Sequence, residues 1–370
     1  MAVETMRQGH DICRRRAGRQ PVEHRIDLHG IGIDDRAACL GRKAHGQSRL
    51  AARGRSRYQD RVFQHACDFL ASGRLMPLVA TLISNPDAAA LSAPLAGEAA
   101  RVLSAQHIGW LATDVACDLI LPDEATAAEV YTRLAALLDG KPIDITIQES
   151  VGRRKKLLIA DMDSTMIDQE CIDELGDEVG LKDHIAAITA RAMNGEIAFE
   201  PALRERVALL AGLDETVIER VVKSRITLAS GGRELVTTMN GNGAWTALVS
   251  GGFDAFTSRI AEQLGFQENR ANQLIVEDGK LTGQVADPIM GREAKAAALR
   301  DITAARGITP ADALAVGDGA NDLDMINLAG TGVALHAKPS VAAAARIRID
   351  HGDLTALLYL QGYRREEFAA

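Results

Sequence analysis

Two carboxylates stand one residue apart directly after a short apolar run, in the stretch Lys155–Thr165 (KKLLIADMDST). The four apolar residues Leu157–Ala160 indicate a short buried strand. Side chains alternate along an extended backbone, so Asp161 and Asp163 leave it on the same side if the extension persists. Two close carboxylates repel each other unless a cation lies between them, and a divalent ion with oxygen ligands suits such a pair. The stretch therefore predicts a Mg²⁺ site; a turn in which Asp163 and Ser164 cap the next helix is the alternative.

Three further polar stretches carry matching chemistry. Ser250-Gly251-Gly252 ends one apolar run, Gly317–Asp322 (GDGAND) ends another, and Lys295 lies in the helix expected before the second. Taken singly, each has an ordinary alternative: a tight turn, an acidic loop that opens a helix, and a solvated lysine. Together they supply what phosphoryl transfer requires, namely a nucleophile, a metal, donors to phosphate oxygens and a fixed cation.

A predominantly helical stretch follows the paired aspartates, with no convincing alternating strand over residues 166–240. It is far longer than a single crossover helix, so it predicts an inserted helical cap over residues 168–240. We expect its helices at residues 168–179, 182–193, 201–211, 214–223 and 232–240.

Strands alternate with helices from residue 241 onward. We expect strands at 247–249, 273–276, 281–285, 313–316, 332–335 and 347–349, and helices at 253–264, 292–305 and 322–328. Asp278-Gly279 separates two of these strands and is a strong signal for a tight hairpin. The alternation predicts a Rossmann-like α/β core, residues 157–167 and 241–370, with a mostly parallel sheet covered on both faces. In such sheets ligands bind beyond the carboxyl ends of the strands.

Residues 76–148 form a separate pattern. We expect strands at 78–83, 107–112, 116–121 and 143–147, and helices at 88–103 and 125–138. This βαββαβ order is typical of ferredoxin-like α+β domains. The topology resembles ACT-type modules of amino-acid metabolism, which bind a ligand at a paired interface; it implies an amino-acid effector and a homodimer, with a packing module that binds no ligand as the alternative. Residues 149–156 are polar, contain a glycine and predict a linker.

Residues 1–75 differ from the rest of the chain in charge. They hold 15 Lys+Arg against 8 Asp+Glu, whereas the remaining residues hold 27 against 42. They lack sustained periodicity, so we expect a disordered basic extension, or a start codon assigned upstream of a true start at Met76. A basic arm for nucleic acid or anionic lipid is the functional alternative, but aromatic residues are few and no recognition motif is present. No nucleic-acid partner is expected.

The composition of the whole chain bounds its class. With 370 residues, 47% of them hydrophobic, it has room for two or three domains with buried cores. No run approaches the roughly 20 apolar residues of a membrane span, and the N-terminus lacks the apolar core of a signal peptide. The five cysteines form no CxxC pair and no dense pattern, which fits a reducing compartment. We expect a cytoplasmic protein without a membrane partner.

The polar motifs, in their order along the chain, resemble the haloacid dehalogenase superfamily of aspartate-nucleophile phosphatases. They are Asp-x-Asp-Ser-Thr, Ser-Gly-Gly, a single Lys, and Gly-Asp-Gly-x-Asn-Asp. More narrowly, residues 155–360 resemble the phosphoserine phosphatase family, whose pattern is matched by Asp163-Ser164-Thr165 with Glu170, and by Phe199 with Leu203, Arg206 and Val207. Ala202 departs from the serine that is common there.

The resemblance implies a reaction through an aspartyl-phosphate. Asp161 would be the nucleophile, because a carboxylate is ionised at pH 7 and needs no activating base. Asp163 would be the general acid and base, which requires a pKa raised by a neighbouring carboxylate. Mg²⁺ would be held by Asp161, the main chain of Asp163 and Asp318, with Asp322 in support. Lys295 would neutralise the charge on Asp161 and the phosphoryl group.

The resemblance also implies a substrate, O-phosphoserine. Ser250 and the Gly251 amide would donate to phosphate oxygens, while Asn321 would orient these groups. The side chains expected to read and enclose the amino-acid part are Glu170 for the ammonium, Arg206 for the carboxylate, and Phe199 and Met193 as a lid. The alternatives are a helix cap for Glu170, a surface ion pair with Glu205 or another neighbour for Arg206, and plain cap core for the two apolar residues.

Two rival functions remain open at this stage. The first is a related phosphatase acting on another small phosphate ester. The second is a receiver-like signalling domain, which also uses an acidic Mg²⁺ pocket and an aspartyl-phosphate; Asp163 and the long helical insertion speak against it.

Overall fold

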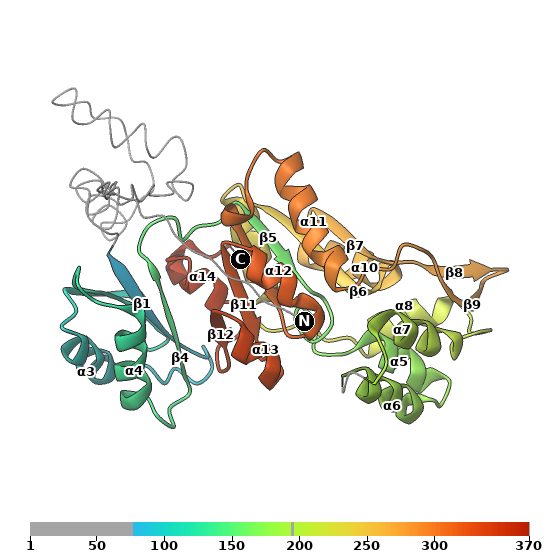
Figure 1. The fold of residues 1–370 in the computed structure, drawn as a ribbon, viewed down its shortest axis with the longest axis horizontal. Coiled ribbons are helices and arrows are strands. Elements are labelled where there is room, and N and C mark those ends of the chain that lie inside the picture. Colours follow the sequence, from blue (N-terminus) through green and yellow to red (C-terminus); the bar gives the residue numbers. More distant parts are fainter. Residues whose placement is uncertain (1–76, 194–195, 370) are drawn as a thin grey trace, which may run out of the picture.

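The computed structural model describes residues 77–193 and 196–369 (Figure 1). The expectations for residues 1–75, for a start at Met76 and for the side chain of Met193 lie outside the described residues. Within this part of the chain, none of the helices has the length and apolar character that crossing a bilayer requires.

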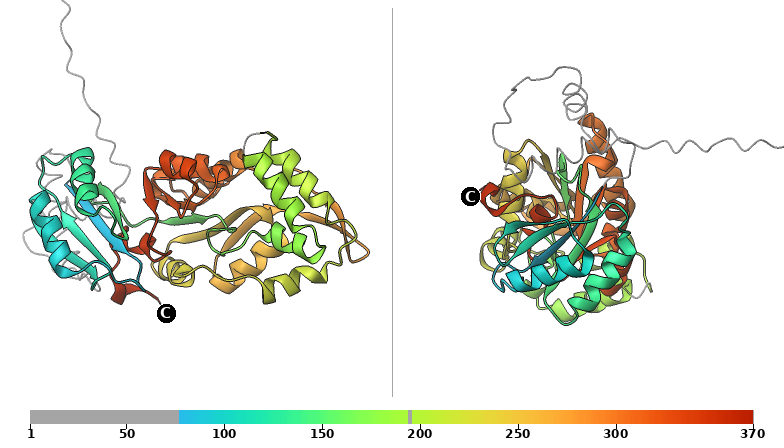
Figure 2. Two further views of the ribbon diagram at one scale, coloured as in Figure 1. Left: turned by 90° about the horizontal axis from the view of Figure 1, so that it is seen from below. Right: turned by 90° about the vertical axis from the view of Figure 1, so that its left-hand side faces the viewer.

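A four-stranded antiparallel sheet and two helices form the N-terminal part of the structure. The strands lie in the order β2-β3-β1-β4. Leu82 and Leu119 of the sheet pack with Leu134 of the second helix in one buried core, and the helices lie against one face of the sheet (Figure 2). The elements are β1 (Leu78–Ser84), α3 (Ala93–Leu103), β2 (His107–Ala112), β3 (Ala116–Ile120), α4 (Ala127–Leu137) and β4 (Ile143–Glu149). They follow the expected βαββαβ order.

The helix expected over residues 88–103 begins later than predicted. α3 starts at Ala93, because Ser92 accepts a hydrogen bond from the amide of Leu95 at 3.4 Å and Pro94 occupies the first turn. Residues 88–92 form no helix, and Ala89 has a positive φ of 44°. Alanine-rich composition suggested helix there, but the serine cap followed by proline marks the true start.

Six parallel strands form the second sheet, in the order β12-β11-β10-β5-β6-β7. β5 lies between β10 and β6, so the carboxyl ends of all three strands meet at one edge. The bounds are β5 (Leu157–Ala160), β6 (Trp245–Phe253), β7 (Glu268–Asn272), β10 (Ala313–Gly317), β11 (Thr331–Leu335) and β12 (Ile347–Ile349). The predicted parallel α/β sheet is confirmed, but β7, whose sequence is ENRAN, was not expected.

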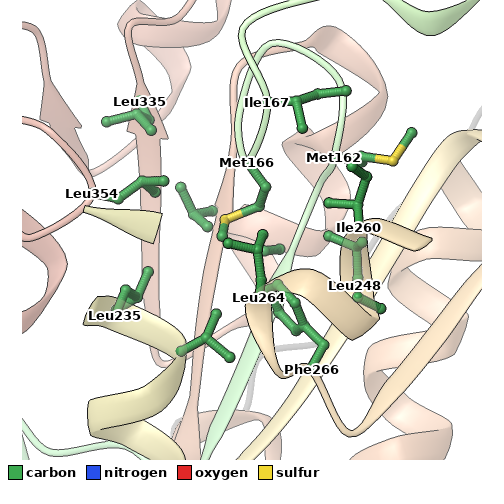
Figure 3. Close-up of a cluster of buried hydrophobic side chains, with 14 of the residues drawn as sticks. Met162, Met166, Ile167, Leu235, Leu248, Ile260, Leu264, Phe266, Leu335 and Leu354 are labelled. Atoms are coloured by element: carbon green, nitrogen blue, oxygen red, sulfur yellow. The ribbon is translucent and has the colours of Figure 1, made fainter. Parts of the chain in front are cut away.

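Helices cover both faces of this sheet. Leu248 packs with Ile260 and Leu264 on one face (Figure 3), whereas Leu157 and Ile159 pack with helices on the other. Each fully buried leucine contributes roughly 1.5–3 kcal/mol to stability. The first face carries α9 (Gly232–Gly241), α10 (Asp254–Leu264) and α14 (Ala356–Tyr359), and the second carries α11 (Arg292–Ala305) and α12 (Leu323–Leu328). The short α13 (Pro339–Ala344) follows β11.

Four helices between β5 and α9 lie together beside the sheet (Figure 1). They are α5 (Cys171–Glu178), α6 (Lys182–Met193), α7 (Phe199–Ala208) and α8 (Thr216–Ser224). α5 was expected from residue 168 but begins at Cys171, because Ile167 pairs with Leu228 in a β-bridge that ties the two connections of the insertion together. α9, expected as a fifth helix of the cap, packs against β6 and α10 instead.

A two-stranded hairpin extends from the second sheet toward these helices. It consists of β8 (Leu274–Glu277) and β9 (Lys280–Val285), and β9 contacts α7. Asp278 and Gly279 form its turn with φ values of 50° and 74°, the left-handed backbone that a two-residue hairpin turn requires. The hairpin predicted from the sequence is confirmed.

The N-terminal sheet docks on the second sheet through buried polar contacts. Arg153 Nη1 lies 2.6 Å from Asp118 Oδ2, and its Nε donates to the carbonyl of Leu360 at 2.9 Å. The buried carboxylate of Asp144 accepts hydrogen bonds from main-chain amides of residues 350–352. Removing one partner of a buried ion pair costs about 3–5 kcal/mol, so these contacts hold the two sheets in a defined relation.

Candidate active site

Three buried carboxylates converge where β5 and β10 end. Asp161 follows β5, while Asp318 and Asp322 follow β10, its hydrogen-bonded neighbour. One oxygen from each carboxylate lies within 4.8 Å of the others. Gly317 permits this approach, because a Cβ there would lie 2.3 Å from Asp322 Cγ. The parallel arrangement of the strands therefore brings Asp161 close to Asp322, which lies 161 positions further along the sequence.

Lys295 is fully buried beneath the carboxylates. Its Nζ lies 2.7 Å from Asp161 Oδ1 and 2.7 Å from Asp322 Oδ1. Burial alone would lower the pKa of Lys295, but the charges of Asp161 and Asp322 outweigh it and raise that pKa above its usual value. The lysine is therefore a permanent cation, positioned by the first turns of α11.

The remaining charge in this cluster is negative. Burial, together with the charge of Asp161, raises the pKa of Asp318 to about 8 and that of Asp322 to about 7. One lysine cannot balance three carboxylates, so a further cation would stabilise the ionised cluster. The donor set consists of carboxylate oxygens, which are the ligands that hard divalent ions such as Mg²⁺ prefer. The residues present thus fit such an ion.

Asp163 faces the carboxyl end of β6. A Cβ at Gly252 would lie 2.7 Å from Asp163 Oδ2, and the Cys171 amide donates to Asp163 Oδ1 at 3.2 Å. Burial raises the pKa of Asp163 well above its usual value, and the charges of Glu170 and Asp161 raise it further. A raised pKa is what a carboxyl group needs in order to give a proton to a leaving group.

Ser250-Gly251-Gly252 was expected to form a turn after a strand at 247–249, but β6 continues through these residues to Phe253. They present hydrogen-bond donors at the same edge of the sheet. Ser250 is buried, and its Oγ accepts the amide proton of Gly252 at 2.9 Å, so the hydroxyl proton remains available to another acceptor. A Cβ at Gly251 would lie 3.2 Å from Phe199 Cζ and 3.5 Å from Asn321 Nδ2. Glycine thus lets the backbone pass close to both side chains.

A cavity of about 500 Å³ connects these groups with the helical insertion. The predicted site residues that line it are Asp161, Asp163, Glu170, Phe199, Arg206, Ser250, Gly251, Asp318 and Asn321. Lys295 and Asp322 lie directly behind Asp161 and are not part of the lining. The structure therefore gathers the predicted residues around one space, except Met193, whose side chain lies outside the description.

Glu170 and Arg206 occupy the cap side of this cavity. Ser164 Oγ donates to Glu170 Oε1 at 2.8 Å. Arg206 is 9% exposed; its Nε donates to the Ala202 carbonyl at 3.2 Å and its Nη1 to Thr189 Oγ1 at 3.1 Å. Burial lowers the pKa of Arg206, although the charges of Glu170, Asp173 and Asp163 counteract it.

The ordinary alternatives for these two residues do not match the geometry. Glu170 stands at the N-cap of α5 but makes no side-chain capping bond. Glu205 pairs with Arg191 at 3.3 Å and not with Arg206. Both side chains line the cavity.

Some residues of the site carried no role in the sequence predictions. Thr165 donates from Oγ1 to Asp318 at 3.4 Å, and Lys338 Nζ lies 3.9 Å from Asp318 Oδ2. Thr189 and Arg292 line the cavity. Thr165 stands within the first motif and could have been singled out, whereas Lys338 has no motif of its own and is brought in only by the fold.

The fold and site define a class of hydrolase with an aspartate cluster at the carboxyl edge of a parallel sheet. Residues 158–327 match the family of haloacid dehalogenase-like hydrolases. The chain is 42% identical over 206 residues to a phosphoserine phosphatase of Methanocaldococcus jannaschii and covers 97% of that protein and 56% of its own length. It is 44% identical over 247 residues to one of Streptomyces coelicolor, covering 67% of this chain and 60% of that protein.

Solved structures give the same result. One, described as a phospho-aspartyl intermediate analogue of phosphoserine phosphatase, matches with a TM-score of 0.53 and 42% identity, over 56% of this chain and 98% of that one. A probable phosphoserine phosphatase from Vibrio cholerae matches with a TM-score of 0.64 and 28% identity, over 82% of this chain and 93% of that one. The chain belongs to the phosphoserine phosphatase family of the haloacid dehalogenase-like hydrolases.

Proposed function

We propose that the chain hydrolyses O-phospho-L-serine to L-serine and phosphate in two steps, through an aspartyl-phosphate on Asp161. The observation that carries the proposal is that the two oxygens of the Asp161 carboxylate differ in their hydrogen-bond partners. Lys295 and the Met162 amide both bind Oδ1, at 2.7 and 2.8 Å. Oδ2 is therefore the oxygen left to attack phosphorus from the wall of the cavity.

In the first step the Asp161–phosphorus bond forms as the bond from phosphorus to the seryl oxygen breaks. Asp163 gives its proton to that oxygen, so serine leaves as the alcohol. Ser250 and the Gly251 amide hold the phosphate oxygens, and Asn321 orients them. In the second step Asp163 takes a proton from water, whose oxygen attacks phosphorus and returns Asp161 as a carboxylate.

Mg²⁺ would be held by Asp161 and Asp318, with the main chain of Asp163 and with Asp322 in support. When bound, it would supply positive charge that lets an anionic nucleophile approach an anionic phosphate. The three clustered carboxylates, with their one buried lysine, support this assignment.

Substrate choice is proposed to reside in the cap. Glu170 would pair with the α-ammonium and Arg206 would grip the α-carboxylate. Phe199, which lies over Gly251, would close the site, and Met193 would extend that lid. Both charged side chains line one cavity, which supports recognition of a zwitterion over recognition of a sugar phosphate.

The wider assignments are proposals as well. Serine release by this reaction would be the last step of serine biosynthesis, in the cytoplasm. We divide the chain into five parts: a basic extension (1–75), an ACT-like domain (76–148), a linker (149–156), a catalytic core (157–167 and 241–370) and a helical cap. The cap was expected over residues 168–240, but its last helix, α9, is assigned to the core because it packs against β6 and α10. The ACT-like domain would bind an amino-acid effector and support a homodimer. The βαββαβ order of β1 to β4 supports the ACT-like domain.

Phosphate release measured with and without Mg²⁺ tests the proposal. Phosphoserine should be turned over only with the metal, and much faster than phosphothreonine or sugar phosphates. Equal turnover of all three esters would overturn the assigned substrate while leaving the phosphatase chemistry. A phosphoryl group that stays on Asp161 without turnover would favour the receiver-like alternative.

A further inference from the structure

A buried asparagine at the end of β7 connects two loops of the site. Asn272 is 1% exposed. Its Nδ2 donates to the carbonyl of Gly251 at 2.8 Å, and its Oδ1 accepts the amide proton of Met290 at 2.6 Å. A longer contact runs from the same Nδ2 to the Met290 carbonyl at 3.4 Å. One side chain therefore fastens the carboxyl end of β6 to the segment that leads into α11.

The hydrogen bond from Asn272 to the Gly251 carbonyl is connected to the Ser250 hydroxyl through the backbone. The Gly251 carbonyl and the Gly252 amide belong to the same rigid peptide plane. That amide donates to Ser250 Oγ at 2.9 Å, so the hydroxyl proton must point away from the Gly252 amide. By holding the carbonyl, Asn272 sets the orientation of the plane and thereby the direction in which Ser250 donates.

The hydrogen bond from the Met290 amide to Asn272 is connected to Lys295 through the start of α11. Met290 precedes Gly291, the N-cap of α11, and the amide of Lys295 donates to the carbonyl of Gly291 at 3.1 Å in the first turn. Asn272 thus fixes the entry of the helix that carries Lys295. No motif covers this residue, because it lies in a polar edge strand.

We propose that Asn272 is a positioning residue for the phosphoryl end of the site, acting on phosphate through Ser250 and Gly252 and on Asp161 through Lys295. The inference rests on the proposed phosphatase chemistry but not on the choice of phosphoserine. Its loss should weaken phosphate binding and slow the chemical step, and it should do so equally for every phosphate ester.

The test is the Asn272→Asp variant, which keeps an acceptor for the Met290 amide and removes the donor to Gly251. We expect kcat to fall about 10- to 100-fold, as is usual when a group that orients a catalytic residue is lost. The inhibition constant of inorganic phosphate should rise, and the relative loss should be the same for phosphoserine and p-nitrophenyl phosphate. Asn240→Asp is the matched control, since Asn240 Nδ2 donates to the Gly265 carbonyl at 2.7 Å away from the site.

A double-mutant cycle separates positioning from simple stabilisation. If Asn272 acts through Ser250, Asn272→Asp should cost clearly less in the Ser250→Ala background than in the wild type. If Asn272→Asp does not fold, Asn272→Ser is the second variant, because its hydroxyl keeps a donor. Its kcat should lie between those of the wild type and of Asn272→Asp. Wild-type kcat and phosphate inhibition in folded Asn272→Asp would overturn the inference, as would full additivity with Ser250→Ala. Wild-type protein inactive on phosphoserine but active on p-nitrophenyl phosphate would instead count against the proposed substrate.

Discussion

The two ends of the cavity are built in different ways. The phosphoryl end consists of strand ends and turns of a single sheet, with Asp161, Lys295 and Asp322 locked together in a buried network. The amino-acid end consists of helices inserted after β5, where Arg206 donates to the Ala202 carbonyl and to Thr189, its hydrogen-bond partners among the residues that the structure describes. Under the proposed function, the sheet would fix the chemistry and the helices would select the molecule on which it acts.

The largest effect is expected from a substitution at the phosphoryl end. Asp161→Asn removes the attacking oxygen and should lower kcat at least about 10³-fold with every phosphate ester. Phosphate release measured with phosphoserine and p-nitrophenyl phosphate checks this. An Asp161→Asn protein that retains a tenth of the activity would contradict the assignment of the nucleophile.

Lys295→Met tests whether the network also supports the fold. The change leaves two buried carboxylates without their cation, so the free energy of unfolding should fall by about 3–5 kcal/mol. Because the fixed positive charge beside the phosphoryl group is lost, kcat should fall about 10²- to 10³-fold. Urea unfolding followed by circular dichroism and steady-state kinetics measure the two effects. An unchanged free energy of unfolding would mean that the network of Asp161, Lys295 and Asp322 does not stabilise the fold.

Gly252→Ala tests the close packing at the phosphoryl end. The new Cβ would lie 2.7 Å from Asp163 Oδ2, so the acid must move and kcat should fall about 10- to 100-fold. Gly241→Ala is the control, since a Cβ there meets nothing within 4 Å. It should leave kcat unchanged and the melting temperature the same or slightly higher. Equal kinetics for the two variants would show that Asp163 is free to shift.

Arg206→Ala tests the amino-acid end and should have the smallest effect on chemistry. Losing a hydrogen-bonded charge pair costs about 1.5–3 kcal/mol, so KM for phosphoserine should rise about 10- to 100-fold. With p-nitrophenyl phosphate, which has no α-carboxylate, KM should hardly change. A similar rise for both substrates would remove the distinction between the two ends.

The sequence predicted the phosphoryl end well because its residues stand in short, specific motifs at strand ends. The placement of Asp161, Ser250 and Asp318 at one edge followed from the rule that ligands bind beyond the carboxyl ends of parallel strands, whereas their roles come from the family resemblance. Asn272 and Lys338 were not predicted, because neither stands in such a motif. One lies in a polar edge strand and the other in a loop after β11, and only tertiary packing brings them to the site.

Element boundaries were less predictable than element types. α3 and α5 both begin later than expected, since caps and a β-bridge override the apolar and alanine-rich pattern that precedes them. α9 has the periodicity of a cap helix yet packs on the core sheet. Periodicity shows that a helix has an apolar face, but it does not show which partner that face will meet.

The most direct test of the account is to trap the reaction on the enzyme. Phosphoserine labelled in its phosphate is mixed with the protein and Mg²⁺, the reaction is quenched in acid within milliseconds, and the labelled peptide is identified by mass spectrometry. The two-step mechanism predicts the label on Asp161 alone, at a level that decays at the rate of phosphate release. Label on another residue, or turnover with no labelled protein at any time, would contradict it.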